Sequence, residues 1–168
     1  MSESGTISNV VNAPRELATF YGTFFHKVSE RKQVALPKHQ KRTIDEAQEG
    51  PLLLMRWQQE QHLRLYTKKQ FDKKLAEVKQ NPNLSDEQKF SAITGIASSA
   101  EPVEPDSQGR FVLPAHWADA LGIRDEVAFC GVGSFIQIWP AEMKREAVKA
   151  ETEKLAAVAP LITSILNI

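Results

Sequence analysis

The chain has 168 residues, 42% of them hydrophobic, and its 21 basic and 21 acidic side chains leave no net charge. This composition is ordinary for a soluble globular protein of one domain, or of two small domains packed together. No apolar run reaches the ~20 residues that a membrane-spanning helix needs, and the polar N-terminus lacks the charged start and apolar stretch of a signal peptide. We therefore expect a cytoplasmic protein. The lone Cys130 cannot form an internal disulfide and is expected to be a buried, inert thiol.

The zero net charge hides an asymmetry along the chain. Residues 21–80 contain 13 lysines and arginines against 7 acidic residues, a balance of +6, whereas residues 81–168 contain 7 against 12, a balance of −5. A basic half can attract phosphate groups. The two halves can equally attract each other or a neighbouring subunit, and charge alone does not decide between these interpretations.

The chain opens with a small, polar stretch over residues 1–20, which is expected to be a flexible lead. Residues 21–36 place aromatic and β-branched residues around the polar tract 29–33, a pattern that predicts a strand, a turn and a second strand. Pro37 ends that strand, and the polar run 38–48 predicts a short helix.

Two further strands are predicted next. Residues 52–57 form an apolar run that begins after a Gly-Pro turn. In residues 62–66, Leu63 and Leu65 alternate with polar neighbours, which is the period of a half-buried strand. A turn over residues 58–61 joins the two.

Two helices follow. Thr67 is a suitable N-cap for a helix over residues 68–79, and Ser85 with Gln88 three residues later is a capping-box signature for a second helix. Each helix carries an apolar stripe at helical spacing: Phe71, Leu75 and Val78 in the first, and Phe90, Ile93 and Ile96 in the second. Such stripes usually face a protein core.

The second half repeats this order of elements. It predicts a turn over 104–109 and a strand over 110–113, a helix over 115–121 closed by Gly122, and strands over 127–130 and 135–139 joined by a hairpin turn at 131–133. A final helix is predicted over residues 141–158, which Pro160 should interrupt. The strongly apolar residues 161–168 are too short to span a bilayer, so we expect them to pack on the body of the protein or on a neighbour.

The repeat is visible in the residues themselves. Gln33-Val34-Ala35-Leu36-Pro37 recurs 77 residues later as Arg110-Phe111-Val112-Leu113-Pro114, and the apolar–aromatic pair Leu65-Tyr66 recurs 73 residues later as Ile138-Trp139. A unit of ~60 residues hides only about 60% of its chain's surface, so two units that share one core make a sounder domain.

We therefore expect a mixed α+β fold with two pseudo-repeated, short-stranded β units around one core. The expected organisation is a flexible lead (1–20), a first repeat (21–72), a helical connector (73–99), a second repeat (100–145) and a C-terminal helix with an apolar tail (146–168).

The turn of the second copy carries candidate functional residues. Asp106 can accept hydrogen bonds from backbone amides two residues on and so fix the turn, and Gly109 permits a positive φ at little steric cost. Arg110 follows the turn, where its planar guanidinium can reach a phosphate or the O6/N7 edge of guanine. Alternatively, Asp106 and Arg110 form an ion pair that only stabilises a surface turn and binds no ligand.

These residues closely resemble a known family, MraZ, whose members are small bacterial regulators built from two AbrB-like swapped-hairpin units. The second copy resembles the family's second repeat at residues 106–115, at 131–133 and at Ile138-Trp139, and the first copy resembles its first repeat at residues 22–26, at 34–38 and at Leu65-Tyr66. The resemblance covers residues 21–143.

The resemblance implies a sequence-specific DNA-binding transcriptional regulator of the bacterial cell-division and cell-wall gene cluster, cytoplasmic and associated with the nucleoid. It implies double-stranded promoter DNA as a partner, assembly into a homo-oligomeric ring, and no cofactor. In the family, this turn carries DNA recognition, which assigns contacts to Asp106, Gln108, Gly109 and Arg110.

The first copy departs from the pattern, because Ser29, Lys32 and Gln33 stand where the second copy has Asp106, Gly109 and Arg110. A lysine at positive φ costs on the order of 1 kcal/mol, so the first turn is expected to have a different shape. Positive charge persists at Arg31, Lys32 and Lys38, with Lys41 and Arg42 nearby. We hypothesise that the first copy binds backbone phosphates nonspecifically, while the second reads bases.

Other chemistry is not indicated. The four histidines and Cys130 show no metal-ligand spacing, and residues 131–133 are too short for a phosphate-binding glycine loop. We therefore expect neither an enzyme nor a metal site, and no small-molecule substrate or membrane partner. The alternative function is an oligomeric scaffold or protein-binding module of the same fold, which has lost operator binding through its degenerate first repeat.

Overall fold

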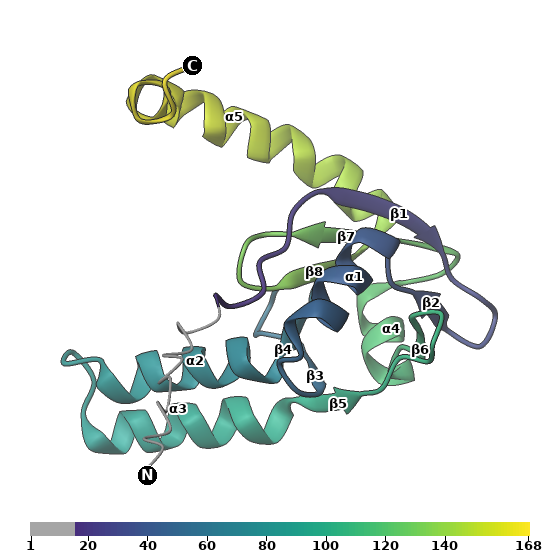
Figure 1. Ribbon diagram of the computed structural model, residues 1–168, viewed down its shortest axis with the longest axis horizontal. Coiled ribbons are helices and arrows are strands. Elements are labelled where there is room, and N and C mark those ends of the chain that lie inside the picture. The colour runs from purple at the N-terminus through teal and green to yellow at the C-terminus, as the bar shows by residue number, and fades with distance from the viewer. Residues whose placement is uncertain (1–15) are drawn as a thin grey trace, which may run out of the picture.

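The computed structural model describes residues 16–168, which form a six-stranded antiparallel sheet, a two-stranded ribbon and five helices (Figure 1). The strands are β1 (Thr23–Lys27), β2 (Gln33–Ala35), β3 (Leu52–Met55), β4 (Leu63–Thr67), β5 (Glu101–Val103), β6 (Arg110–Val112), β7 (Glu126–Gly131) and β8 (Ile136–Pro140). The helices are α1 (Lys38–Ala47), α2 (Lys68–Gln80), α3 (Asp86–Ser99), α4 (Ala115–Leu121) and α5 (Ala141–Leu166). The predicted α+β class is confirmed.

The two repeats exchange their outer strands. The six-stranded sheet has the order β1-β7-β8-β4-β3-β5, so β1 of the first repeat pairs with β7 of the second, and β5 of the second pairs with β3 of the first. The central strands β4 and β8 come one from each repeat, and β2 pairs with β6 across the repeats. Each repeat is therefore completed by the other, as in a pair of swapped hairpins.

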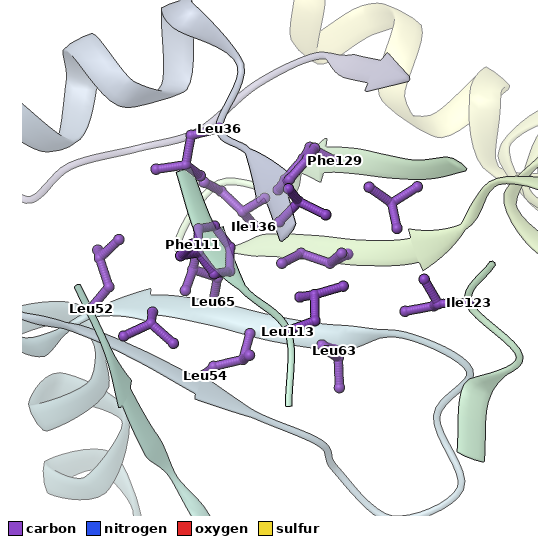
Figure 2. Packing of buried hydrophobic residues seen from close by; sticks show 14 of the residues in the cluster. Leu36, Leu52, Leu54, Leu63, Leu65, Phe111, Leu113, Ile123, Phe129 and Ile136 are labelled. Atoms are coloured by element: carbon purple, nitrogen blue, oxygen red, sulfur yellow. The ribbon is translucent and has the colours of Figure 1, made fainter. Parts of the chain in front are cut away.

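The main core lies on one face of the sheet, beneath the β2–β6 ribbon, α1 and α4. Strand alternation selects its members, because Leu63 and Leu65 point to this face whereas Arg64 and Tyr66 point to the other. The ribbon adds Val34 and Phe111, and Figure 2 shows Phe111 among leucines and isoleucines from both repeats. Full burial of one such side chain contributes roughly 1.5–3 kcal/mol to stability.

The opposite face of the sheet is covered by helices that extend away from the body. α2 and α3 form an antiparallel pair over a smaller core of Met55, Tyr66 and Phe71 (Figure 1). α5 packs mainly on β7 and β8 through its first turns and then projects alone. None of the helices within residues 16–168 is long and apolar enough to cross a membrane.

The predicted helix starts are confirmed where their signals are local. The Thr67 side chain accepts a hydrogen bond from the Gln70 amide at 3.2 Å, and Ser85 and Gln88 form both bonds of the capping box. Cys130 is buried as predicted, and burial raises the pKa of its thiol.

Two expectations for the helices are wrong. Phe90 is 74% exposed, because α3 is too far out on its hairpin for the whole stripe to reach the core. α5 continues through Pro160, because a proline that removes one helix hydrogen bond can bend a helix without ending it. The chain changes direction there, and Figure 1 shows the last turns nearly end on. Residues 161–168 are exposed and do not pack on their own body, so of the two expected partners only a neighbour is left.

Residues 1–15 of the expected flexible lead lie outside the described residues, and the remainder of that lead is fixed on the body. Ala18 and Phe20 are buried, and Phe20 forms a bridge with Gly133. The buried carboxylate of Glu49 accepts hydrogen bonds from the Ala18 amide at 2.6 Å and the Thr67 hydroxyl at 2.7 Å. The chain thus joins the fold before residue 21, where the first repeat was expected to begin.

Candidate nucleic-acid interface

The β2–β6 ribbon presents one side of each strand to the outside. Alternation buries Val34 and Phe111 and turns their neighbours outward, among them Gln33, Arg110 and Val112. Each strand follows its own tight turn, residues 29–32 before β2 and 106–109 before β6. Because the strands are antiparallel, the two turns lie at opposite ends of the ribbon.

The second turn is fixed by the Asp106 carboxylate. One carboxylate oxygen accepts hydrogen bonds from the amides of Gln108 and Arg110, both at 2.9 Å, and the other accepts from Nε of Arg110 at 2.8 Å. Bonds from the Arg110 amide and then from its guanidinium hold the pKa of Asp106 below its ordinary value. Gly109 takes φ +80°, as predicted for this turn.

The first turn has the same backbone shape, and the expectation of a different one is wrong. The Lys32 amide donates to the Ser29 carbonyl at 2.9 Å, which matches the 2.9 Å bond from Gly109 to Asp106 in the second turn. The Ser29 hydroxyl accepts from the Gln33 amide at 3.0 Å, in the role of the Asp106 carboxylate. Lys32 adopts φ +62° because the ribbon and its own side-chain bond hold it there.

That side-chain bond changes the assignment of Lys32. Its ammonium group donates to the Ile123 carbonyl at 2.9 Å, so this half-buried lysine stabilises the contact between the first turn and the end of α4. The outward residue after this turn is the neutral Gln33. The first turn therefore presents less positive charge than its sequence indicates, and Arg31 is its exposed cation.

Arg110 is held outward at the end of the ribbon. Its side chain is 47% exposed, and Asp106 occupies only the Nε edge of the guanidinium. In the part of the chain that the structure describes, the two Nη groups have no hydrogen-bond partner. The ion pair thus orients the guanidinium and leaves two nitrogen donors free for a phosphate or a base edge.

The start of α1 adds positive charge beside this turn. The Leu36 amide donates to the Gly109 carbonyl at 2.9 Å, which brings Lys38 and the rest of the helix next to the second turn. The aliphatic part of Lys41 lies over Gly109, where an added Cβ would sit 3.1 Å from its Cδ. Lys38 and Lys41 belong to the first copy in sequence, and the repeat offset does not indicate this contact across the repeats.

The remaining candidates lie apart from one another. Gln108 is exposed at the tip of the second turn, and Arg31 is exposed at the first. Within residues 16–168, the structure contains no group of three or more histidine, cysteine, aspartate or glutamate side chains placed to hold a metal ion.

Two interleaved repeats with paired turns at the ends of one ribbon define a double swapped-hairpin protein of the AbrB type. Residues 96–154 match the family model described as "MraZ protein, putative antitoxin-like". Over these residues the chain is similar to the MraZ family.

Relatives from several bacteria, each named "Transcriptional regulator MraZ", are similar over most of their length. The chain is 23% identical to the protein of Bacteroides thetaiotaomicron over 143 residues, which is 85% of this chain and 92% of that one. It is 28% identical to the Micrococcus luteus protein and 29% identical to the Kocuria rhizophila protein, each over 141 residues, 80% of this chain and 94% of the relative.

Proposed function

We propose that this chain is a sequence-specific DNA-binding transcriptional regulator that acts as a homo-oligomer in the cytoplasm, at the promoter of the bacterial cell-division and cell-wall gene cluster. The observation that carries the proposal is the outward guanidinium of Arg110, oriented by Asp106 and flanked by the basic start of α1. The names of the relatives support the same reading.

In this proposal the two turns do different work. Arg110 reads a base, with Gln108, Gly109 and Asp106 shaping the turn around it, while Arg31 and Lys38 contact backbone phosphates. Lys32 contributes less than its charge suggests, because its ammonium group is bonded to Ile123. Gln33 supplies polar donors and acceptors but no charge.

A single contact of this kind is weak, which is why the proposal includes self-association. One bidentate arginine–base contact supplies about 1–3 kcal/mol of discrimination. Several copies of Arg110 on one assembly act together through effective concentration, and a ring that faces DNA with several turns would raise the total avidity. The ring is the assembly that we propose.

The experiment compares binding to DNA from upstream of the protein's own gene cluster with binding to shuffled DNA of the same composition. Fluorescence anisotropy over a salt series gives both affinities. Arg110→Ala should reduce the preference for the upstream DNA by roughly 5- to 150-fold per independent contact. Arg145→Ala is the matched control, since its side chain is similarly exposed (48%) and also ion-paired, but lies on α5.

One observation favours a second candidate, an oligomeric scaffold that no longer binds DNA. The first turn presents Gln33 in place of an arginine and turns Lys32 toward Ile123. If the wild-type protein binds neither DNA at low salt while keeping its assembly, the scaffold is the better description. If Arg110→Ala and Arg145→Ala reduced the preference for the upstream DNA equally, that result would also count against base recognition by Arg110.

A further inference from the structure

The outer part of α5 carries an apolar surface that nothing in the described chain covers. From residue 148 to the end of the chain, every residue except Ala159 is exposed. We call the large aliphatic side chains from residue 155 onward the α5 apolar face: Leu155, Val158, Leu161, Ile162, Ile165, Leu166 and Ile168. Leu161 and Ile165 are each 72% exposed.

These side chains lie on one side of the helix. Leu155 and Ile162 are spaced by seven residues, as are Val158 and Ile165, whereas one interval earlier Glu151 interrupts the pattern after Val148. A heptad spacing of this kind is the pattern by which one helix packs along another. Beyond residue 154, the opposite side of the helix holds small and polar residues, including Pro160, Thr163 and Ser164.

The α5 apolar face extends beyond the segment that defines the family. The match to the family model ends at residue 154, and residues 155–168 contain no charged side chain. Burial of this segment would therefore desolvate no charge.

The first repeat shows how the fold covers an equivalent helix. α2 follows β4 as α5 follows β8, and the antiparallel α3 packs against α2. Among the described residues, no second helix packs along α5, and Figure 1 shows it projecting alone. A helix from outside the chain would complete the matching arrangement.

The size of the surface fits a subunit contact. Its seven side chains are 36–84% exposed, so at about 100 Å² for a fully exposed aliphatic side chain they offer roughly 400 Å² of apolar surface. A standard protein–protein interface takes about 800 Å² from each partner, of which a little over half is apolar, so the α5 apolar face is close to the size that such a contact needs.

We propose that the α5 apolar face pairs with the same face of a second copy, with the two helices antiparallel. Antiparallel overlap of residues 155–168 places the two bodies at opposite ends and keeps the charged first half of α5 out of the contact. A membrane surface is a poorer occupant, because a helix that lies on a membrane carries lysine or arginine on its polar side, and residues 155–168 contain neither. The inference rests on the proposed self-association and not on DNA binding.

Light scattering on the full chain tests the contact. The double variant Leu161→Glu/Ile165→Glu should lower the mass of the assembly at least twofold. The matched control Ser164→Glu/Asn167→Glu adds the same charge to the other side of the helix and should keep the wild-type mass. Circular dichroism checks that both variants stay helical. A monomeric wild type, or equal masses for all three proteins, would overturn the proposal.

Disulfide trapping tests the orientation, in a Cys130→Ala background. Antiparallel overlap of residues 155–168 has its midpoint near Ile162, so Ile162→Cys should form a disulfide-linked dimer and Val148→Cys should not. Linking at both positions would show a parallel pair, and linking at neither would show that α5 docks elsewhere, for example on a neighbour's α2–α3 hairpin. Neither readout involves DNA, so a failure here is separate from a failure of the Arg110 experiment.

Discussion

Replacement of Gly131 by alanine should detach the segment that precedes β1 from the sheet. A Cβ atom added at Gly131 would lie 2.2 Å from the backbone nitrogen of Tyr21 and 2.4 Å from the carbonyl carbon of Phe20. Both neighbours are backbone atoms, so no side-chain rotation relieves the overlap. The segment must move away or the strand must distort.

The contacts at risk give the magnitude. Three backbone hydrogen bonds fix the segment: Phe20 N to Gly133 O at 2.8 Å, Gly133 N to Phe20 O at 2.9 Å, and Gly131 N to Gly22 O at 2.8 Å. At about 0.5–1.5 kcal/mol each, together with roughly 1.5–3 kcal/mol for the buried ring of Phe20, their loss should lower the free energy of unfolding by roughly 3–7 kcal/mol.

Equilibrium unfolding in urea measures the effect, and Gly95→Ala is the control. Gly95 lies inside α3 with nothing within 4 Å of an added Cβ, so its replacement should raise stability by about 0.5–1 kcal/mol. If Gly131→Ala unfolds within about 1 kcal/mol of the wild type while Gly95→Ala gains stability, the close approach at Gly131 is not what holds the segment.

Three further predictions concern the turns and the buried polar groups. Ser29→Asp/Gln33→Arg should create a second Asp–Arg turn, since the backbones of the two turns match. The double variant should bind DNA more tightly, and the slope of log K against log salt concentration should steepen by about 0.9 for each new phosphate contact. An unchanged slope would contradict the prediction. Glu49→Ala should lower the free energy of unfolding by about 1–3 kcal/mol for each of the two donors left without an acceptor, and Glu49→Gln should lower it by less. Equal losses for the two variants in a urea titration would show that these hydrogen bonds to Glu49 do not stabilise the fold. Burial lowers the pKa of His62 below its ordinary 6.5, so as pH falls the unfolded chain takes up this proton at a higher pH than the folded protein does. The contribution of neutral His62 to stability should therefore be fully present above pH 6.5 and should decrease as pH drops below that value. His62→Gln should make Tm depend less on pH in this range.

The features that sequence analysis predicted correctly are local ones. The alternation around Leu63 and Leu65 fixes which side of β4 is buried, and the Thr67 and Ser85 caps act within one helical turn. The outward position of Arg110 follows from the same alternation, together with a turn that Asp106 and Gly109 specify between them. Each of these depends on residues at most four positions apart.

The features that it missed depend on contacts between distant segments. β5 has three residues, one of them Pro102, and it forms a strand only because β3 offers an edge to pair with. Lys32 tolerates a left-handed conformation because Ile123, 91 residues away, accepts its ammonium group. Lys41 reaches the second turn only because the repeats exchange strands. No spacing within one copy carries this information.

The exchange of outer strands makes the two copies depend on each other. Loss of either copy would leave two edges of the remaining sheet without a neighbouring strand, so both copies are needed to complete the sheet. At the same time, the shape of each turn is held partly by the other copy, through the bonds from Leu36 to Gly109 and from Leu113 to Lys32. The first turn therefore keeps its shape without the glycine and the arginine of the second, because the other copy holds the shared ribbon in register.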